Sequence, residues 1–300
     1  MEAESSSVDS SSLFHTMIRM VEDDSNGTID NNTPLSIEHA KINKLVPRIT
    51  GVITLLSSLC MLWMAWSRRR RLFHRLVLGM SVHLLIQGVF LIYGTAASPL
   101  SNFGTIATCT TQGFFIYVTD ITALSYYCTF SIYSYVGVLN NFEKQQIIWV
   151  EKYIHMLVHI YPICSAFYIL SQQGFNDAEL GFCFIASSPF RCWFDTSIPC
   201  ERGPPSQLMI LFWYVPLWIV LIFPSIIMVI LFVKMRKGQE HIFIDATSVA
   251  KQAFVYLVPL FWVLIPFLIM YFLRLKSTID YQRYFIFAQT NYAIFSLWAM

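Results

Sequence analysis

The stretch that decides the fold reads ITGVITLLSSLCMLWMAW over residues 49–66, and Ser67 and the arginines at 68–71 follow at once. It holds 18 residues without a charge. Such a segment forms roughly 27 Å of helix, close to the roughly 30 Å thickness of a bilayer's hydrocarbon core. The stretch therefore predicts a membrane-spanning helix, and the arginines predict where that helix leaves the hydrocarbon.

The remainder of the chain is apolar in the same way. Of the 300 residues, 56% are hydrophobic and 13% are charged, and the mean hydropathy is +0.55, whereas a soluble domain carries about 25% charged residues. Further apolar stretches occupy residues 72–94, 112–139, 153–170, 208–233, 250–273 and 284–300. We therefore predict an all-α membrane protein whose domain, residues 49–300, is a bundle of seven transmembrane helices. We expect the seventh helix to be cut short at Met300.

Charge distribution predicts the orientation of this bundle. Eleven basic residues flank the loops after spans one, three and five, and nine lie on the opposite side. The totals are close, but the arginine cluster after span one should dominate and place that loop in the cytoplasm, with the N-terminus outside. The polar residues 1–48 are expected to form a disordered extracellular tail. Its sequons predict glycosylation at Asn26 and Asn31.

Cysteine placement agrees with this orientation. Four cysteines fall on the predicted outer side, where an oxidising compartment permits disulfides: Cys109, Cys183, Cys192 and Cys200. The other three fall inside predicted spans and are expected to be free: Cys60, Cys128 and Cys164.

Asp120 is the one acidic residue inside a predicted span. A carboxylate there costs about 2.5–3.5 kcal/mol, so it should face the bundle interior and find a partner. His83 lies at a comparable depth and could supply a charge-assisted pair. Two interpretations stay open: Asp120 contacts a ligand or changes protonation when the bundle rearranges, or it is a packing residue that is protonated or bound to water.

The candidate ligand-binding residues project from several spans. Prolines and aromatic residues crowd spans five and six, where prolines kink helices and give the bundle places to flex. Many of these aromatics could equally face lipid. Gln289 begins a polar cluster in span seven. The predicted ligand site consists of Asp120, His83, Tyr117, Trp213, Trp262 and Gln289.

The sequence contains little that indicates an enzyme. His155 and His159 stand one helical turn apart with Glu151 a turn earlier, a spacing that can bind zinc, but no third ligand is evident beyond His83. No phosphate loop, nucleophile elbow or H-E-x-x-H motif is present. We predict no enzyme, cofactor or metal and no nucleic-acid partner, since arginines beside a membrane helix indicate topology and contact with anionic membrane lipids.

Several short segments in order resemble a known receptor family. They are Pro47-Arg48-Ile49, His74-Arg75-Leu76-Val77-Leu78-Gly79-Met80-Ser81-Val82, Cys109-Thr110-Thr111-Gln112-Gly113-Phe114, Gly181-Phe182-Cys183-Phe184-Ile185, Pro199-Cys200-Glu201-Arg202-Gly203, Pro216-Leu217-Trp218 and Val249-Ala250-Lys251-Gln252-Ala253. Together they resemble G-protein-coupled receptors of the secretin-like and cAMP-receptor-like type, as found in protists. The resemblance covers residues 46–300.

The resemblance implies two disulfides. The Cys-aromatic pair Cys183-Phe184 in the second outer loop resembles the one that bridges to the top of span three, here Cys109. Cys192 would then pair with Cys200. Because Cys192-Trp193 is also a Cys-aromatic pair, Cys109 with Cys192 remains an alternative.

The resemblance also implies a function. We expect a plasma-membrane receptor that transmits the binding of a small extracellular ligand to a heterotrimeric G protein. The basic residues expected to face the G protein are Arg68, Arg69, Arg70, Arg71, Lys144, Arg236 and Lys237. The chain departs from the family in two respects: the tail has no cysteine for a stapled ectodomain, and no Lys or Arg lies inside the bundle to hold cAMP. The alternatives are a zinc-dependent lipid hydrolase and a transporter or channel.

Overall fold

A computed structural model describes residues 37–70, 72–99, 103–139, 144–189, 192, 197–203 and 208–237, together with residues 261, 265, 266 and 269. Its helices are α2 (Ile37–Ser67), α3 (Leu72–Tyr93), the short 3₁₀ helix η2 (Gly94–Ala97), α4 (Ile106–Leu139), α5 (Lys144–Ser171) and α6 (Leu208–Lys237). Two strands, β1 (Phe175–Asp177) and β2 (Cys183–Ile185), form a hairpin. The seventh predicted span, and all but four residues of the sixth, lie outside the described residues.

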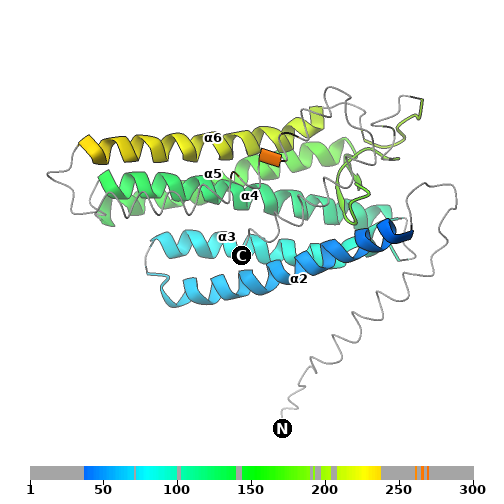
Figure 1. Ribbon diagram of the computed structural model, residues 1–300, viewed down its shortest axis with the longest axis horizontal. Helices are drawn as coiled ribbons and strands as arrows, with labels where there is room; N and C mark the ends of the chain where they lie inside the picture. The colour runs from blue at the N-terminus through cyan, green and yellow to red at the C-terminus, as the bar shows by residue number, and fades with distance from the viewer. Residues whose placement is uncertain are drawn as a thin grey trace, which may run out of the picture.

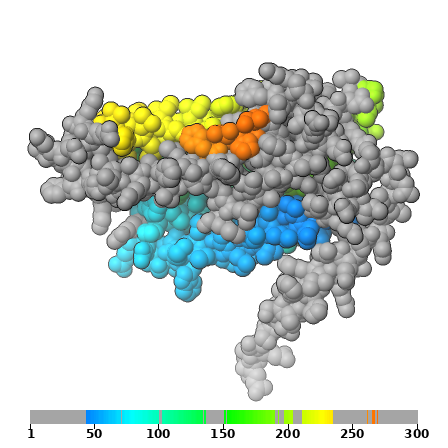
Figure 2. All heavy atoms as spheres, in the orientation of Figure 1, coloured from blue at the N-terminus to red at the C-terminus, as the bar shows by residue number. Residues whose placement is uncertain are grey.

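The long helices run side by side along the long axis of the molecule (Figure 1). α2 and α3 lie along one edge, α6 along the other, and α4 and α5 between them; Figure 2 shows the same two edges in space-filling form. We call the end that carries β1 and β2 the hairpin end, and the end where α2 gives way to α3 the arginine end. α2 runs from the hairpin end to the arginine end, and each following long helix runs antiparallel to the one before it (Figure 1).

Among the described residues, four helical segments are long and apolar enough to cross a membrane, judged by length and composition: Lys44–Ser67, Leu72–Ala97, Tyr153–Ser171 and Leu211–Lys234. They correspond to predicted spans one, two, four and five. Their outward faces carry large apolar side chains, with Leu157 65% and Val229 61% exposed. An apolar exterior of this kind is what lipid-facing helices present.

α4 corresponds to predicted span three and is not among these four segments. Its buried polar side chains are Gln112, Thr119, Asp120, Thr122, Thr129 and Ser131. α4 contacts α3, α5, α6 and both strands. Because these neighbours cover it, α4 can carry polar groups that a lipid-facing helix could not.

The start of α2 corrects one prediction. Residues 37–48 were expected to belong to a disordered tail, but they form the first turns of α2, which begins at Ile37. The segment IEHAKINKLVPR is polar, yet it is rich in residues that favour helix, such as Glu38, Ala40 and Lys41. The helix therefore extends past the apolar stretch. Asn26 and Asn31 lie outside the described residues.

α2 and α3 approach each other closely at two glycines. A Cβ on Gly51 would lie 2.7 Å from the Ile92 nitrogen, and a Cβ on Gly88 would lie 2.9 Å from the Leu55 nitrogen and 3.0 Å from the Gly51 oxygen. These neighbours are backbone atoms, so neither helix can yield locally. Small residues permit this direct contact, which is how helices pack where no hydrophobic driving force exists between them.

Candidate functional site

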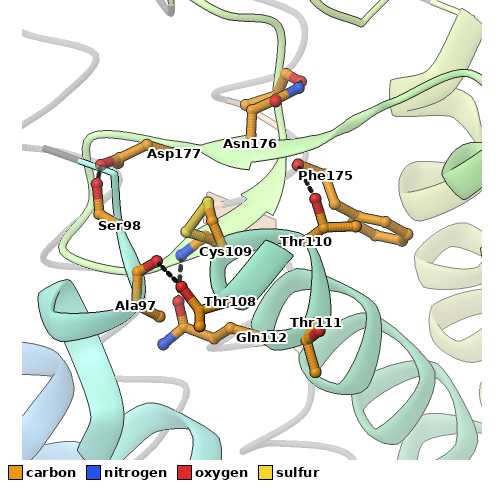
Figure 3. The surroundings of a disulfide bond; sticks show 12 residues. Ala97, Ser98, Thr108, Cys109, Thr110, Thr111, Gln112, Phe175, Asn176 and Asp177 are labelled. Atoms are coloured by element: carbon orange, nitrogen blue, oxygen red, sulfur yellow. Dashed lines mark hydrogen bonds between the residues drawn. A yellow bond between two sulfur atoms is a disulfide. The ribbon is translucent and has the colours of Figure 1, made fainter. Parts of the chain in front are cut away.

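The hairpin is fastened to α4 by a disulfide. β1 and β2 pair antiparallel, with Asp177 opposite Cys183. Cys183 is bonded to Cys109 in the first turn of α4, with Cα atoms 5.3 Å apart, and Cys192 is bonded to Cys200 with Cα atoms 5.4 Å apart (Figure 3 shows the surroundings of the first). These are the two pairings that the family resemblance implies, and the alternative of Cys109 with Cys192 is not formed. Cys60, Cys128 and Cys164 are free.

Gln112 strengthens the same junction (Figure 3). Its Nε2 donates to the carbonyls of Phe90, at 2.8 Å, and Gly94, at 3.0 Å, while its Oε1 accepts from the Cys183 N–H at 2.8 Å. One buried amide thus joins α3, α4 and β2. Gln112 is not among the predicted site residues, although its place one helical turn after Cys109 indicates that the two share a face.

Asp177 ties the hairpin to the end of α3. Its carboxylate accepts hydrogen bonds from the Ser98 hydroxyl and, at 2.7 Å, from the Glu179 N–H (Figure 3 draws the Ser98 contact). Burial raises the pKa of Asp177, while these two hydrogen bonds act in the opposite direction. The folded protein therefore holds a proton on this carboxyl more tightly than the unfolded chain does.

This difference predicts a pH dependence of stability. Where the folded state binds more protons, stability falls as pH rises, here from about 3.9, the ordinary pKa of an aspartate, up to the raised value in the folded state. Asp177→Asn should remove this component from thermal melts recorded in detergent across that range. Glu201→Gln, at an exposed loop carboxylate, should leave it unchanged. Equal pH profiles for wild type and Asp177→Asn would contradict the assignment.

Aromatic rings from the hairpin and the helices meet beneath the hairpin. We call Tyr117, Phe175, Phe184 and Trp213 the hairpin aromatic cluster. The Phe184 and Trp213 ring centroids lie 5.0 Å apart, and the Tyr117 ring lies 6.0 Å from Phe175 and 6.4 Å from Trp213. The structure thus brings together two of the predicted ligand-binding residues, Tyr117 and Trp213. Phe261, from the sixth predicted span, packs against the same core.

The Tyr117 hydroxyl also lies beside the Phe212 backbone carbonyl, which has no helical hydrogen-bond donor because of Pro216. Pro216 has no N–H, so it cannot bond the carbonyl of Phe212 four residues earlier. The hydroxyls of Tyr117, at 3.1 Å, and Tyr161, at 3.0 Å, lie within hydrogen-bond distance of that oxygen. Tyr117 is also 2.8 Å from the Ser165 hydroxyl. We call this arrangement of Tyr117, Tyr161 and the Phe212 carbonyl the tyrosine clasp; it joins α4, α5 and α6.

The clasp makes a specific energetic prediction. Tyr117→Phe or Tyr161→Phe alone should cost about 1 kcal/mol, because the carbonyl keeps one donor. The double variant leaves the Phe212 carbonyl without either donor inside an apolar segment, and should cost more than the sum of the two single changes by roughly 1–2 kcal/mol. Pro216→Ala restores the missing N–H and should remove most of this excess. Thermal unfolding of the single, double and Pro216→Ala variants measures this excess. If the two single losses simply added, and Pro216→Ala did not change that sum, the clasp would be excluded.

Asp120 lies one turn beyond Tyr117 on α4 and is buried, as predicted. Its partner differs from the prediction: the Gln87 side-chain amide donates to the Asp120 Oδ1, and His83 instead approaches His159. His83 and Gln87 are four residues apart on α3 and share a face. Depth alone therefore could not tell which of the two would reach Asp120. The Gln87 Oε1 is buried and has no partner among the described residues.

The histidines form a second polar cluster, nearer the arginine end. The Nε2 atoms of His83 and His159 are 2.9 Å apart, and the His159 Nδ1 lies 2.5 Å from the His155 carbonyl. A carbonyl only accepts, so we assign the proton of neutral His159 to Nδ1 and make its Nε2 an acceptor. His83 then donates from Nε2. Its Nδ1 is left as a buried lone pair without a partner in the described structure.

The predicted zinc alternative gains no support from this cluster. His155 does not join the other two histidines: its Nδ1 is 2.8 Å from the Tyr126 hydroxyl, and its Nε2 is 3.8 Å from Glu151. Glu151 is itself in a two-point ion pair with Arg75, with both N–O distances 2.6 Å. Within the described ranges no three metal-ligating side chains converge on one point.

The remaining predicted residues divide into three groups. Arg68, Arg69 and Arg70 are exposed at the arginine end. Lys144 begins α5, and Arg236 and Lys237 end α6, but their side chains lie outside what the structure describes. Arg71, Trp262 and Gln289 fall on residues that are not described.

Compared with known protein families and with curated proteins, the chain gives no match.

Proposed function

We propose that the chain is a seven-helix plasma-membrane receptor of the secretin-like and cAMP-receptor-like type, with the hairpin end outside the cell. A small ligand binds at the hairpin aromatic cluster, and a heterotrimeric G protein binds at the arginine end. This orientation is supported by Cys109–Cys183 and Cys192–Cys200, since disulfides persist in an oxidising compartment. It agrees with the positive-inside rule for Arg68, Arg69 and Arg70.

The observation that carries the proposal is the double role of Tyr117. Its ring contacts Phe175 and Phe184 of the hairpin, and its hydroxyl takes part in the tyrosine clasp at the Phe212 carbonyl of α6. A ligand that displaces the ring therefore also perturbs the bond that stabilises the α6 backbone at Pro216. Trp213 adjoins Phe212 in the chain, so ligand contact with either side of the cluster acts on the same turn of α6.

The chemistry of transmission is a shift between two packings of α4, α5 and α6. In the packing described here, the clasp is closed and Lys234, near the far end of α6, donates to the Tyr135 hydroxyl of α4 at 3.0 Å. A ligand that prefers an open clasp would increase the population of a second packing in proportion to its differential affinity. The Lys234–Tyr135 contact would then change at the surface offered to the G protein.

Nucleotide exchange tests the proposal. Cells that express the chain with each class of Gα subunit would be challenged with small-molecule libraries, and GTP exchange on Gα would be recorded. Trp213→Ala should lower the potency of an active compound at least tenfold, whereas Trp63→Ala, at a side chain 80% exposed, should not. Surface expression of each variant provides the control. Failure of every combination of compound and Gα, with wild-type protein at the surface, would contradict receptor function.

A further inference from the structure

A stripe of exposed apolar side chains on α2 ends at a cluster of arginines. Leu56, Leu59, Trp63 and Trp66 follow the spacing of one helix face and are 60%, 44%, 80% and 56% exposed. Ten residues separate the first from the last, about 15 Å of helix. This is about half the roughly 30 Å hydrocarbon core, the depth that the acyl chain of one leaflet occupies.

The arginines continue from the stripe at its charged end. The Arg69 guanidinium lies 4.6 Å from the centre of the Trp66 ring, a cation–π distance. Arg68 and Arg70 are exposed in the turn that follows α2. Tryptophan is enriched at the membrane–water interface, where its amphipathic ring lies at the level of the lipid headgroups. Trp66 and the adjacent arginines are therefore expected to lie at that level.

The charges of these arginines are not balanced by carboxylates in the described structure. Glu151 is engaged with Arg75 at the same end, and Lys234 donates to Tyr135. No ion pair involves Arg68, Arg69 or Arg70 within the described ranges. Three adjacent cations next to an apolar stripe of leaflet depth therefore complement a molecule with an anionic head and an acyl tail.

We propose that this surface binds an anionic phospholipid, with its acyl chain along Leu56, Leu59 and Trp63 and its headgroup at Arg68, Arg69 and Arg70. The site requires that α2 spans a bilayer, but it does not depend on the receptor function proposed above. It gives the arginines a ligand that is present whether or not a G protein is bound.

The test uses the full chain, purified into nanodiscs of phosphatidylcholine that contain a fixed fraction of either brominated phosphatidylserine or brominated phosphatidylcholine. Bromine quenches tryptophan fluorescence on contact. The emission of Trp63 and Trp66 is isolated by subtracting a Trp63→Phe/Trp66→Phe variant, since the chain has eight tryptophans. The ratio of quenching by the two lipids gives the preference for the anionic headgroup.

Wild type should prefer brominated phosphatidylserine, and the preference should weaken as salt rises. One basic residue near an anionic surface contributes roughly a fivefold preference. Changing Arg68, Arg69 and Arg70 together to glutamine should therefore lower it at least tenfold. Changing the three to lysine should preserve most of it, and Lys234→Gln, at the same end, should leave it within twofold.

The controls separate lipid binding from folding and from the G protein. Equal melting temperatures of the glutamine and lysine variants would exclude a general loss of structure. An unchanged preference in the glutamine variant would overturn the proposal. If that variant also lost nucleotide exchange, the arginines would belong to the G-protein surface instead. No G protein is present in the nanodiscs, so failure of the receptor proposal leaves the lipid measurement intact.

Discussion

Replacing Gly88 with leucine is expected to separate α2 from α3 and to lower stability more than any other single change considered. Even a methyl group there would lie 2.9 Å from the Leu55 nitrogen and 3.0 Å from the Gly51 oxygen. Overpacking a core usually costs about 1–3 kcal/mol when side chains can adjust. Here the obstructing atoms are backbone, so the cost should reach or exceed the upper value. The apparent melting temperature in detergent should fall by roughly 6–12 °C.

The matched control is the adjacent residue. Val89 is 43% exposed on the outward side of α3, so Val89→Leu places the same leucine side chain where nothing obstructs it. Its melting temperature should stay within about 2 °C of wild type, the shift that corresponds to a small surface effect. A Gly88→Leu protein that melted with wild type would show that α2 and α3 do not meet at these glycines.

Removing the Cys109–Cys183 disulfide is expected to have the second-largest effect. The bond closes a loop across a sequence separation of 74 residues. Chain entropy alone would assign such a crosslink about 4.5 kcal/mol. Helices that stay inserted in the bilayer after unfolding already restrict the chain, so this is an upper value. Cys109→Ser/Cys183→Ser should also release β2 from the Gln112 side chain and expose the hairpin aromatic cluster.

The second disulfide provides the comparison. Cys192–Cys200 spans only 8 residues in sequence, for which the same relation gives about 2.5 kcal/mol. Cys192→Ser/Cys200→Ser should therefore be milder, and it should leave the hairpin on α4. Thermal melts and hydrogen exchange of residues 175–185 would measure both variants. A larger loss from the short loop than from the long one would contradict the part assigned to the hairpin junction.

Sequence patterns predicted the helices of this bundle better than its interior. Length and apolar composition locate the segments that became α2, α3, α5 and α6, since those properties belong to each segment alone. The apolar pattern failed at residues 37–48, where a polar helix carries α2 beyond its apolar stretch. Hydropathy also gave no sign that α4 would be central, because that position depends on neighbours far away in the sequence.

In the candidate site, too, the sequence predicts the properties of single residues but not the partners that packing brings to them. Burial of Asp120 followed from the cost of a carboxylate in lipid, but its partner did not, because Gln87 and His83 share one face of α3 and only the helix crossing selects between them. Pro216 likewise predicts an unpaired Phe212 carbonyl from sequence alone. That Tyr117 and Tyr161 supply the donors is a property of the packing of three helices.

The polar contacts between α3, α4 and α5 are the interactions that a displacement of these helices would break. From the hairpin end they run through Gln112 to Asp120 with Gln87, then to the histidines and finally to Arg75 with Glu151. Each contact joins two different helices. A displacement of one helix along its axis would therefore break several of these bonds together, which favours discrete packings over gradual ones.

The orientation of the bundle is the central claim, because disulfide formation and the proposed ligand and G-protein contacts all depend on it. α2 begins at the hairpin end, so an epitope placed before residue 37 reports the side on which that end lies. We predict antibody staining of intact cells, together with a glycosidase-sensitive gel shift that Asn26→Gln/Asn31→Gln abolishes. Staining only after permeabilisation, with no shift, would place the hairpin end in the cytosol and contradict the receptor account.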